Sequence, residues 1–327
     1  MAGVRDGIYG LCVADALGVP AECCTGDQLR QHPATRMSAG GTRRHPPGHW
    51  SDDSSMTLCL ADSIGEVGWF HTHDIMERFF RWFTRGDYTP GGVCFDFGHA
   101  CARAIHRYQR GSTPALCGGK GPDDNGNGSL MRILPAAFVL YGRWGKEVAR
   151  SSRAMREIHT LSGLTHRHPL ALSACGIYVS VACHLLDGEA PDQAVRDGVR
   201  QALGWYRFHS RFEKVLPYWE RLAALPDLPE EEIFSGGYVV ESLEASLWCL
   251  LHTADYRECV LRAVNLGYDA DSTAAIAGGL AGICYGFAAI PQEWIVGLAG
   301  RDIIERCVEG LEAFCRTDAH EGSREDG

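Results

Sequence analysis

The sequence predicts an all-α protein that folds as a single compact domain of many helices. Apolar residues recur at helical spacing along most of the chain, whereas alternating runs flanked by hairpin dipeptides are nearly absent. No internal repeat and no shift in composition marks a boundary between domains. Because 45% of its 327 residues are hydrophobic, the chain can bury a substantial core.

The first expected helix, residues 7–17, is rich in small residues, and the second, residues 54–67, carries a mixed apolar face. Residues 272–292 are uncharged and rich in glycine and alanine. They predict a buried helix packed closely through small side chains, since they are too weakly apolar for a membrane span. The other expected helices span residues 93–108, 130–141, 152–161, 169–186, 190–205, 211–224, 238–252, 256–266 and 303–315. We therefore expect a folded domain over residues 1–315 and a polar, disordered tail over residues 316–327.

Composition limits the partners. The net charge of −10, from 31 basic and 41 acidic residues, argues against nucleic acid or a membrane surface as the main partner. The 14 cysteines form no C-x-x-C pair and sit mostly in apolar segments, and the N-terminal residues lack a signal-peptide layout. These features favour a cytoplasmic protein, expected to be a monomer, without a zinc site or a thiol nucleophile.

Three long loops interrupt the helices, at residues 30–50, 112–127 and 225–237, and two of them lead directly into candidate site motifs. Long loops in a compact domain are more often functional than accidental. We expect the first two to shape the specificity of a binding cleft.

Two acidic segments lie far apart and each leads into an apolar helical run: Trp-Ser-Asp-Asp-Ser at 50–54 and Gly-Tyr-Asp-Ala-Asp-Ser at 267–272. In the second, carboxylates two residues apart leave the same side of an extended backbone. In the first, adjacent carboxylates can converge because a helix start is not yet helical. Helix capping alone is the simpler explanation of either segment. Together they indicate a site for Mg²⁺ or Mn²⁺, which prefer carboxylate and hydroxyl oxygens, because so many carboxylates repel one another without a cation.

Four smaller motifs also carry polar groups. Residues 126–132, Gly-Asn-Gly-Ser-Leu-Met-Arg, form a flexible entry to a helix that could bind a phosphate, or could be a plain turn. His166 precedes another helix and could bind substrate or satisfy a backbone group. Asp15 and Glu22 frame the end of the first helix, and Asp96 interrupts an apolar run, where a buried carboxylate needs a partner.

The order of these motifs resembles the ADP-ribosylglycohydrolases, and the resemblance runs from about Gly7 to Trp294. Six motifs in one order are far more specific than any one of them. They are Asp15-Ala-Leu-Gly with Glu22, Trp50-Ser51-Asp52-Asp53-Ser54, Phe95-Asp96-Phe97-Gly98, Gly126-Asn127-Gly128-Ser129-Leu130-Met131-Arg132, Thr165-His166 and Asn265-Leu266-Gly267-Tyr268-Asp269-Ala270-Asp271-Ser272.

The resemblance implies an all-helical fold with two Mg²⁺ ions, or Mn²⁺, at the bottom of a cleft. Carried over motif by motif, one ion would be held by Ser51, Asp52 and Asp53 and the other by Asp269 and Ser272, with Asp271 bridging both. The diphosphate and ribose would be held by Gly126, Asn127, Gly128, Ser129 and His166. Glu22 would lie near the scissile bond, and Asp96 would approach the ribose or the leaving group.

This sequence departs from the family pattern at a few positions. Ser51 and Ser272 replace the usual threonines and keep the hydroxyl group. Tyr268 stands where many relatives carry glycine, so that its ring could stack on the substrate or narrow its entry. His99 replaces an asparagine, which puts the polar role of that asparagine in doubt.

The implied activity is metal-dependent hydrolysis of the glycosidic bond between ADP-ribose and its acceptor, and the expected acceptor is arginine on a protein. Such a reaction passes through an oxocarbenium-like state and needs proton transfer, for which Glu22 is the favoured residue. Three alternatives remain: an O-linked acceptor such as ADP-ribosyl-serine, a small ADP-ribosylated molecule, and a non-catalytic ADP-ribose-binding protein. The expected partners are ADP-ribose and an ADP-ribosylated protein.

Overall fold

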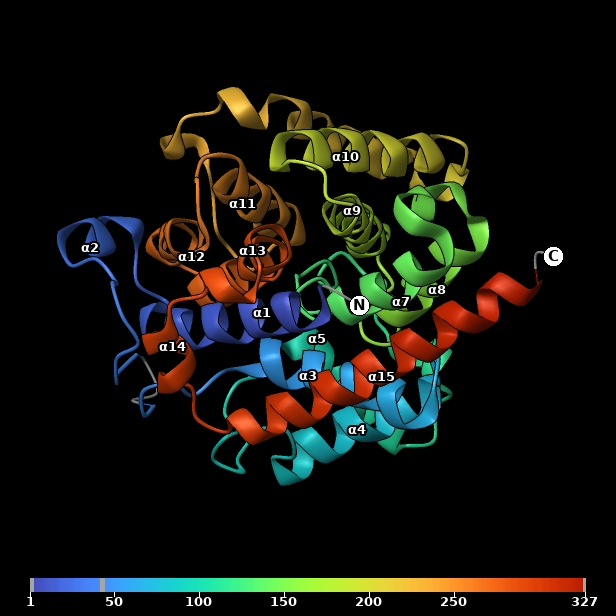
Figure 1. Ribbon diagram of the computed structural model, residues 1–327, viewed down its shortest axis with the longest axis horizontal. Coiled ribbons are helices and arrows are strands. Elements are labelled where there is room, and N and C mark those ends of the chain that lie inside the picture. The colour runs from blue at the N-terminus through green and yellow to red at the C-terminus, as the bar shows by residue number, and fades with distance from the viewer. Residues whose placement is uncertain (1–2, 42–44, 326–327) are drawn as a thin grey trace.

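The computed structural model describes residues 3–41 and 45–325. Within these ranges the chain is helical and has no β-strand, only three isolated bridges between loops. Figure 1 shows one body in which α1 runs between two groups of helices, with α9 to α13 on one side and α3, α4 and α15 on the other. The prediction of an all-α domain is confirmed.

The longer helices are α1 (Val4–Gly18), α3 (Asp52–Val67), α4 (Thr72–Arg85), α5 (His99–Gln109), α7 (Leu134–Trp144), α8 (Ser152–Gly163), α9 (Pro169–Leu186), α10 (Pro191–Arg207), α11 (Val239–Leu251), α12 (Tyr256–Asn265), α13 (Ala270–Tyr285) and α15 (Arg301–Glu325). Short helices are α2 (Gly26–Gln31), α6 (Pro114–Cys117) and α14 (Gln292–Gly297). The 3-10 segments are η1 (Val19–Ala21), η2 (Gly145–Arg150), η3 (Ser210–Asp227), η4 (Glu230–Glu232) and η5 (Phe287–Ala289).

Several elements differ from the sequence-based expectation. The short helices α2, α6 and α14 were not expected, the helix expected over 130–141 begins only at Leu134, and the one expected over 272–292 ends at Tyr285. Helix α4 was not expected, although its buried Ile75, Phe79 and Trp82 recur at helical spacing. The helix expected over 211–224 is instead the 3-10 segment η3, because Pro217 and Pro226 remove backbone donors. The helix expected over 93–108 begins only at His99.

Close contact between α1 and α13 sets the centre of the molecule. The Gly10 α-carbon lies so near α13 that an added Cβ would come within 2.4 Å of the Gly278 carbonyl oxygen. A Cβ on Gly18 would come within 2.3 Å of the Asp271 α-carbon. The expected packing of a glycine- and alanine-rich helix through small residues is confirmed, and it brings the start of α13 against the end of α1.

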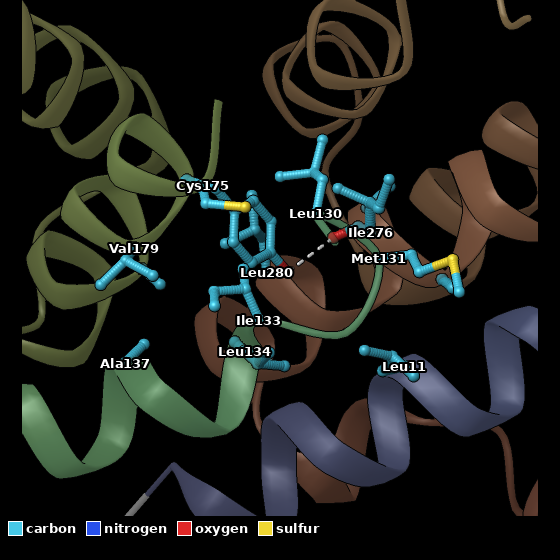
Figure 2. Close-up of a cluster of buried hydrophobic side chains, with 14 of the residues drawn as sticks. Leu11, Leu130, Met131, Ile133, Leu134, Ala137, Cys175, Val179, Ile276 and Leu280 are labelled. Carbon is cyan, nitrogen blue, oxygen red and sulfur yellow. Dashed lines mark hydrogen bonds between the residues drawn. The ribbon is translucent and has the colours of Figure 1, made fainter. Parts of the chain in front are cut away.

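The core is continuous across this contact. Figure 2 shows side chains from α1, α7, α9 and α13, with the segment preceding α7, meeting in one buried cluster. Helix α9 is long and apolar enough to cross a membrane by length and composition, but 89% of it is buried inside the protein. Its apolar character is therefore accounted for by its place in the core.

The chain remains helical beyond residue 315, the expected end of the folded domain. Helix α15 continues to Glu325. Within this extension the buried Asp318 accepts a hydrogen bond from Arg143 Nε at 2.8 Å. Residues up to 318 thus pack against the body. In the loop expected to shape specificity, residues 30–50, positions 42–44 lie outside the described residues.

Candidate active site

The first acidic segment is held in place by a carboxylate from α1. Ser51 caps α3, and its Oγ accepts the Asp53 N–H at 3.3 Å. The fully buried Asp15 accepts hydrogen bonds from Ser51 N–H, at 3.0 Å, and from the N–H and hydroxyl of Ser54, at 2.9 and 2.6 Å. A helix N-terminus favours a carboxylate. Asp15 therefore fixes the position of α3 and of the two aspartates in its first turn.

The second acidic segment begins α13 and lies against the first. Ser272 Oγ donates to Asp53 Oδ2 at 3.2 Å, and Ser51 Oγ donates to the same oxygen at 2.8 Å. Asp269 is held from another direction, since Asn127 Nδ2 donates to its Oδ2 at 2.6 Å. Segments more than two hundred residues apart in the sequence thus form one acidic cluster.

Two groups of carboxylates bring their oxygens within 4.8 Å of one another. One comprises Asp15, Asp53 and Asp271, and the other Glu22, Asp96 and Asp271. Burial raises the pKa of Asp53 and of Asp271 well above the usual aspartate value, and the neighbouring carboxylates raise both further. The cluster therefore resists ionisation in the absence of a cation.

The donor set fits a hard divalent cation. Asp53 Oδ1 is buried and has no hydrogen-bond partner among the described residues, which is costly for a carboxylate unless another group binds it. The surrounding groups are carboxylates and serine hydroxyls, the oxygen ligands that Mg²⁺ and Mn²⁺ prefer. Asp15 is a poor ligand in comparison, because both its oxygens already accept hydrogen bonds from α3.

A cavity of about 360 Å³ opens onto the cluster. Its lining includes ten of the fourteen predicted site residues: Glu22, Asp52, Asp96, Gly126, Asn127, Gly128, His166, Asp269, Asp271 and Ser272. A larger cavity, of about 780 Å³, lies between α10 and η3 and contains none of these residues.

The other four predicted residues do not line the cavity. Ser51 and Asp53 lie beneath the cavity floor in the buried cluster. The fully buried Ser129 directs its hydroxyl group to Ser162 Oγ at 2.8 Å, so only its backbone could reach a ligand. Tyr268 is 54% exposed and does not line the cavity.

The segment that carries Asp96, residues 95–98, is held in a non-helical conformation by a contact with the acidic cluster. Gly98 N–H donates to Asp52 Oδ2 at 3.3 Å, and Gly98 caps α5 with extended backbone angles. This contact keeps residues 95–98 outside the helix, which explains why the helix expected from residue 93 starts later. Asp96 and Phe97 consequently line the cavity.

The glycine loop of residues 126–128 passes close to His166. A Cβ on Gly128 would come within 2.9 Å of His166 Cε1 and 3.4 Å of its Nε2. Asn127 N–H donates to the Gly237 carbonyl oxygen at 3.1 Å, so a strand-like contact fixes this loop against the segment that precedes α11. The predicted substrate loop, His166 and the acidic cluster therefore share one cavity.

Tyr268 connects the second acidic segment to the loop that carries Glu22. Its N–H donates to the Cys24 carbonyl oxygen at 2.6 Å, and its own carbonyl oxygen accepts the Cys23 N–H at 2.8 Å. Tyr268 adopts a φ of 57°, a left-handed conformation that is unfavourable for a bulky side chain. Such strain often accompanies a functional position.

Sequence reasoning assigned no site role to Asp15 and gave Asn127 only a substrate contact. In the structure Asp15 anchors α3, and the side chain of Asn127 holds Asp269 and donates to Ser242 Oγ at 3.0 Å. The Asp15 carboxylate faces inward on a helix of small apolar residues, and an unpaired acid in that setting was the available signal.

The structure thus combines an all-α body with a buried cluster of carboxylates that could hold a metal ion beneath a polar cavity. The model of the ADP-ribosylglycohydrolase family matches residues 2–321 of this chain. The chain belongs to this family, and it is therefore a hydrolase that acts on glycosyl bonds of ADP-ribose.

Individual relatives agree with this assignment. ADP-ribosyl-[dinitrogen reductase] glycohydrolase of Rhodospirillum rubrum is 32% identical, over 94% of this chain and 95% of the relative. ADP-ribosylarginine hydrolase Tri1 of Pseudomonas putida (strain GB-1) is 30% identical, over 94% of this chain and 77% of the relative. A solved structure described as an ADP-ribosylglycohydrolase-related protein complex superposes with a TM-score of 0.73 at 30% identity, covering 96% of this chain and 98% of the other.

Proposed function

We propose that this protein is a divalent-cation-dependent hydrolase that releases ADP-ribose from ADP-ribosylated arginine side chains of proteins. The observation that carries the proposal is the convergence of the two acidic segments beneath a cavity that also contains Glu22, Asp96 and His166. The arginine linkage is supported by two relatives named ADP-ribosylarginine hydrolase, at 30% and 29% identity.

In this proposal Mg²⁺, or Mn²⁺, is held by the two acidic segments through Ser51, Asp52, Asp53, Asp269, Asp271 and Ser272. When bound, such ions supply positive charge that orients ribose hydroxyl groups and acidifies water. Asp53 Oδ1, which is buried without a hydrogen-bond partner in the described part of the chain, supports this assignment.

Glu22 is proposed as the residue that carries out the proton transfer that hydrolysis of the glycosidic bond requires. A carboxylate oxygen of Glu22 lies within 4.8 Å of carboxylate oxygens of both Asp96 and Asp271, and Glu22 lines the cavity. Cleavage of the glycosidic bond makes the ribose carbon oxocarbenium-like, and nearby carboxylates stabilise that positive charge. Asp96, which also lines the cavity, is proposed to orient the ribose or the leaving group.

Exposed aromatic rings could receive the acceptor. Phe97 is 42% exposed and lines the cavity, and Tyr268 is 54% exposed beside Asp269. A guanidinium group stacks favourably on aromatic rings, with a gain of roughly 0.5–1 kcal/mol at exposed sites. This favours arginine over an acceptor that lacks a planar cation.

The test is release of free ADP-ribose from arginine-ADP-ribosylated protein, with Mg²⁺ and with chelator, in the native protein and in Asp271→Ala. We expect release that requires the cation and is lost in the variant, whereas Asp227→Asn, at an exposed carboxylate outside the cavity, keeps full activity. Release that survives Asp271→Ala would contradict the proposed site.

A serine-linked substrate provides the second arm of this experiment. Turnover of the serine-linked but not the arginine-linked substrate would overturn the proposed acceptor while keeping the hydrolase. Tight ADP-ribose binding with no turnover of either substrate would instead indicate a binding protein.

A further inference from the structure

A buried arginine, Arg132, follows Met131 of the cavity lining and has no carboxylate partner among the described residues. Arg132 is fully buried, and its Nε and Nη1 have no hydrogen-bond partner among the residues that the structure describes. Its Nη2 donates to the Leu161 carbonyl oxygen at 3.2 Å and to Thr165 Oγ1 at 2.8 Å, while the ring of Phe79 lies 4.7 Å from its guanidinium carbon. A buried charge is costly, so the orientation it imposes on Thr165 is a candidate reason for its presence.

The Arg132 contact determines how the hydroxyl group of Thr165 can be used. A guanidinium group only donates hydrogen bonds, so Thr165 Oγ1 must be the acceptor in this pair. Its own hydrogen is then free to point elsewhere, and His166 Nδ1 lies 2.9 Å from the oxygen. Cys101 also lies near this hydroxyl, but a thiol sulfur is a much weaker acceptor than an imidazole nitrogen.

This arrangement selects one tautomer of His166. If Nδ1 accepts the hydrogen of Thr165, the single hydrogen of a neutral imidazole must be on Nε2. The ring is neutral because burial lowers the pKa of His166 to about 3. The backbone is fixed as well, since His166 N–H donates to the Ser162 carbonyl oxygen at 2.9 Å and Ser162 Oγ donates to the His166 carbonyl oxygen at 3.2 Å.

The Nε2 side of the ring faces the glycine loop. A Cβ on Gly128 would come within 3.4 Å of Nε2, and one on Gly126 within 3.9 Å. His166 and both glycines line the cavity. An Nε2–H group at this position would be able to donate a hydrogen bond to a ligand oxygen beside the loop.

We propose that Arg132 and Thr165 are positioning residues that fix His166 as its Nε2–H tautomer, so that the ring donates a hydrogen bond to a phosphate or ribose oxygen of the ligand. The identity of that ligand rests on the proposed function, whereas the tautomer does not. Arg132 and Thr165 themselves act only through His166 and touch no substrate.

The tautomer is measured directly in the full-length protein by two-bond nitrogen–hydrogen NMR correlation of the histidine rings. His166→Gln identifies the His166 signals by their loss. We expect a protonated-type Nε2 and an unprotonated-type Nδ1 in the native protein. Thr165→Val should shift His166 toward the other tautomer or a mixture, and Thr165→Ser should retain the native pattern.

Ligand binding gives the second readout. Thr165→Val is expected to weaken ADP-ribose binding about tenfold, the loss of one hydrogen bond to a charged group, and Thr165→Ser to leave it within about twofold. ADP, which lacks the terminal ribose, distinguishes the two sources of oxygen. A loss for ADP as well indicates a phosphate, and a loss for ADP-ribose alone indicates the ribose.

A protonated Nδ1 in the native protein, or an unchanged tautomer in folded Thr165→Val, would overturn the proposal even if the enzyme hydrolyses ADP-ribosyl-arginine. Failure of the proposed function would give a different result. His166 would then show the expected tautomer, but the protein would neither bind ADP-ribose nor release it from a substrate. Unchanged thermal unfolding of Thr165→Ser and near-native unfolding of Thr165→Val show that the readouts are not due to misfolding.

Discussion

Tyr268 combines an exposed ring with a strained backbone next to a proposed metal ligand. A left-handed conformation costs an L-residue roughly 1–2 kcal/mol relative to its preferred regions, and glycine would avoid that cost. Two backbone hydrogen bonds to Cys23 and Cys24 maintain this conformation. The retention of a tyrosine under this strain is explained if its ring contacts the acceptor.

At the residue scale, we predict that Tyr268→Gly raises KM for arginine-ADP-ribosylated protein by roughly three- to fivefold, the loss of one exposed cation–π contact. The affinity for free ADP-ribose should not change, and the free energy of unfolding should stay equal or rise by up to about 1 kcal/mol as strain is relieved. Steady-state kinetics, titration and thermal unfolding measure the three quantities.

Two further variants serve as controls for this prediction. Tyr268→Phe keeps the ring and should keep the native KM. Phe208→Ala removes a ring that is 89% exposed and absent from the cavity lining, and it should have no effect. An unchanged KM in Tyr268→Gly would show that the ring does not contact the acceptor.

At the scale of elements, the contact between α1 and α13 brings the site together. Glycines allow the two backbones to approach, with Gly10 against Gly278 and Gly18 against Asp271. This approach places Asp15 of α1 and Asp271 of α13 within one group of converging carboxylates. A change in the spacing of the two helices would therefore alter stability and the acidic cluster together.

We predict that Gly10→Ala lowers the free energy of unfolding by roughly 1–3 kcal/mol, because the new Cβ would lie 2.4 Å from a backbone oxygen that cannot move away. Cation affinity should fall in parallel. Gly204→Ala, in α10, is the matched control: nothing lies within 4 Å of its added Cβ, and alanine should stabilise the helix by up to about 1 kcal/mol. Equal stability of the two variants would contradict this account.

At the scale of the whole molecule, the buried acids couple cation binding to folding. Burial raises the folded-state pKa of Asp15 to about 6, and raises that of Asp52, Asp53 and Asp271 well above the usual value. The folded pKa values exceed the unfolded ones. The contribution of these acids to the free energy of unfolding of the metal-free protein is therefore fully present at low pH. It is lost as the pH rises through the folded pKa values.

We therefore predict that Mg²⁺ raises the melting temperature more at about pH 8 than at about pH 5.5, because protons compete with the cation for the same carboxylates. At a hundred times the dissociation constant the stabilisation should reach about 2.7 kcal/mol. Thermal unfolding with Mg²⁺ and with chelator measures the difference at each pH.

Asp271→Asn is the control for this coupling. It removes one of the repelling charges, so the metal-free variant should melt higher than the metal-free native protein at about pH 8 and should gain little from Mg²⁺. A Mg²⁺ effect of the same size at both pH values would argue against cation binding by these acids.

The sequence predicts the all-helical class, most of the helices and the small-residue packing of α13. This is possible because helical periodicity depends on residues three or four positions apart in the chain. The family could be identified as well, from six short motifs in order. Helix boundaries near the site were less predictable. The contact of Gly98 with Asp52 joins segments 46 residues apart, and no local pattern contains that information.

What the sequence by itself determined is therefore the type of each element and the chemical nature of the site: carboxylates and hydroxyl groups at two helix starts, with a glycine loop and a histidine. The tertiary structure decided which of these groups share a cavity, that Asp15 and Asn127 hold the acids in place, and that Ser129 faces the core. The physical reason is the distance along the chain over which each kind of interaction acts. Helix formation depends on neighbours in the chain, whereas burial and hydrogen bonds between distant segments exist only after α1 and α13 have packed.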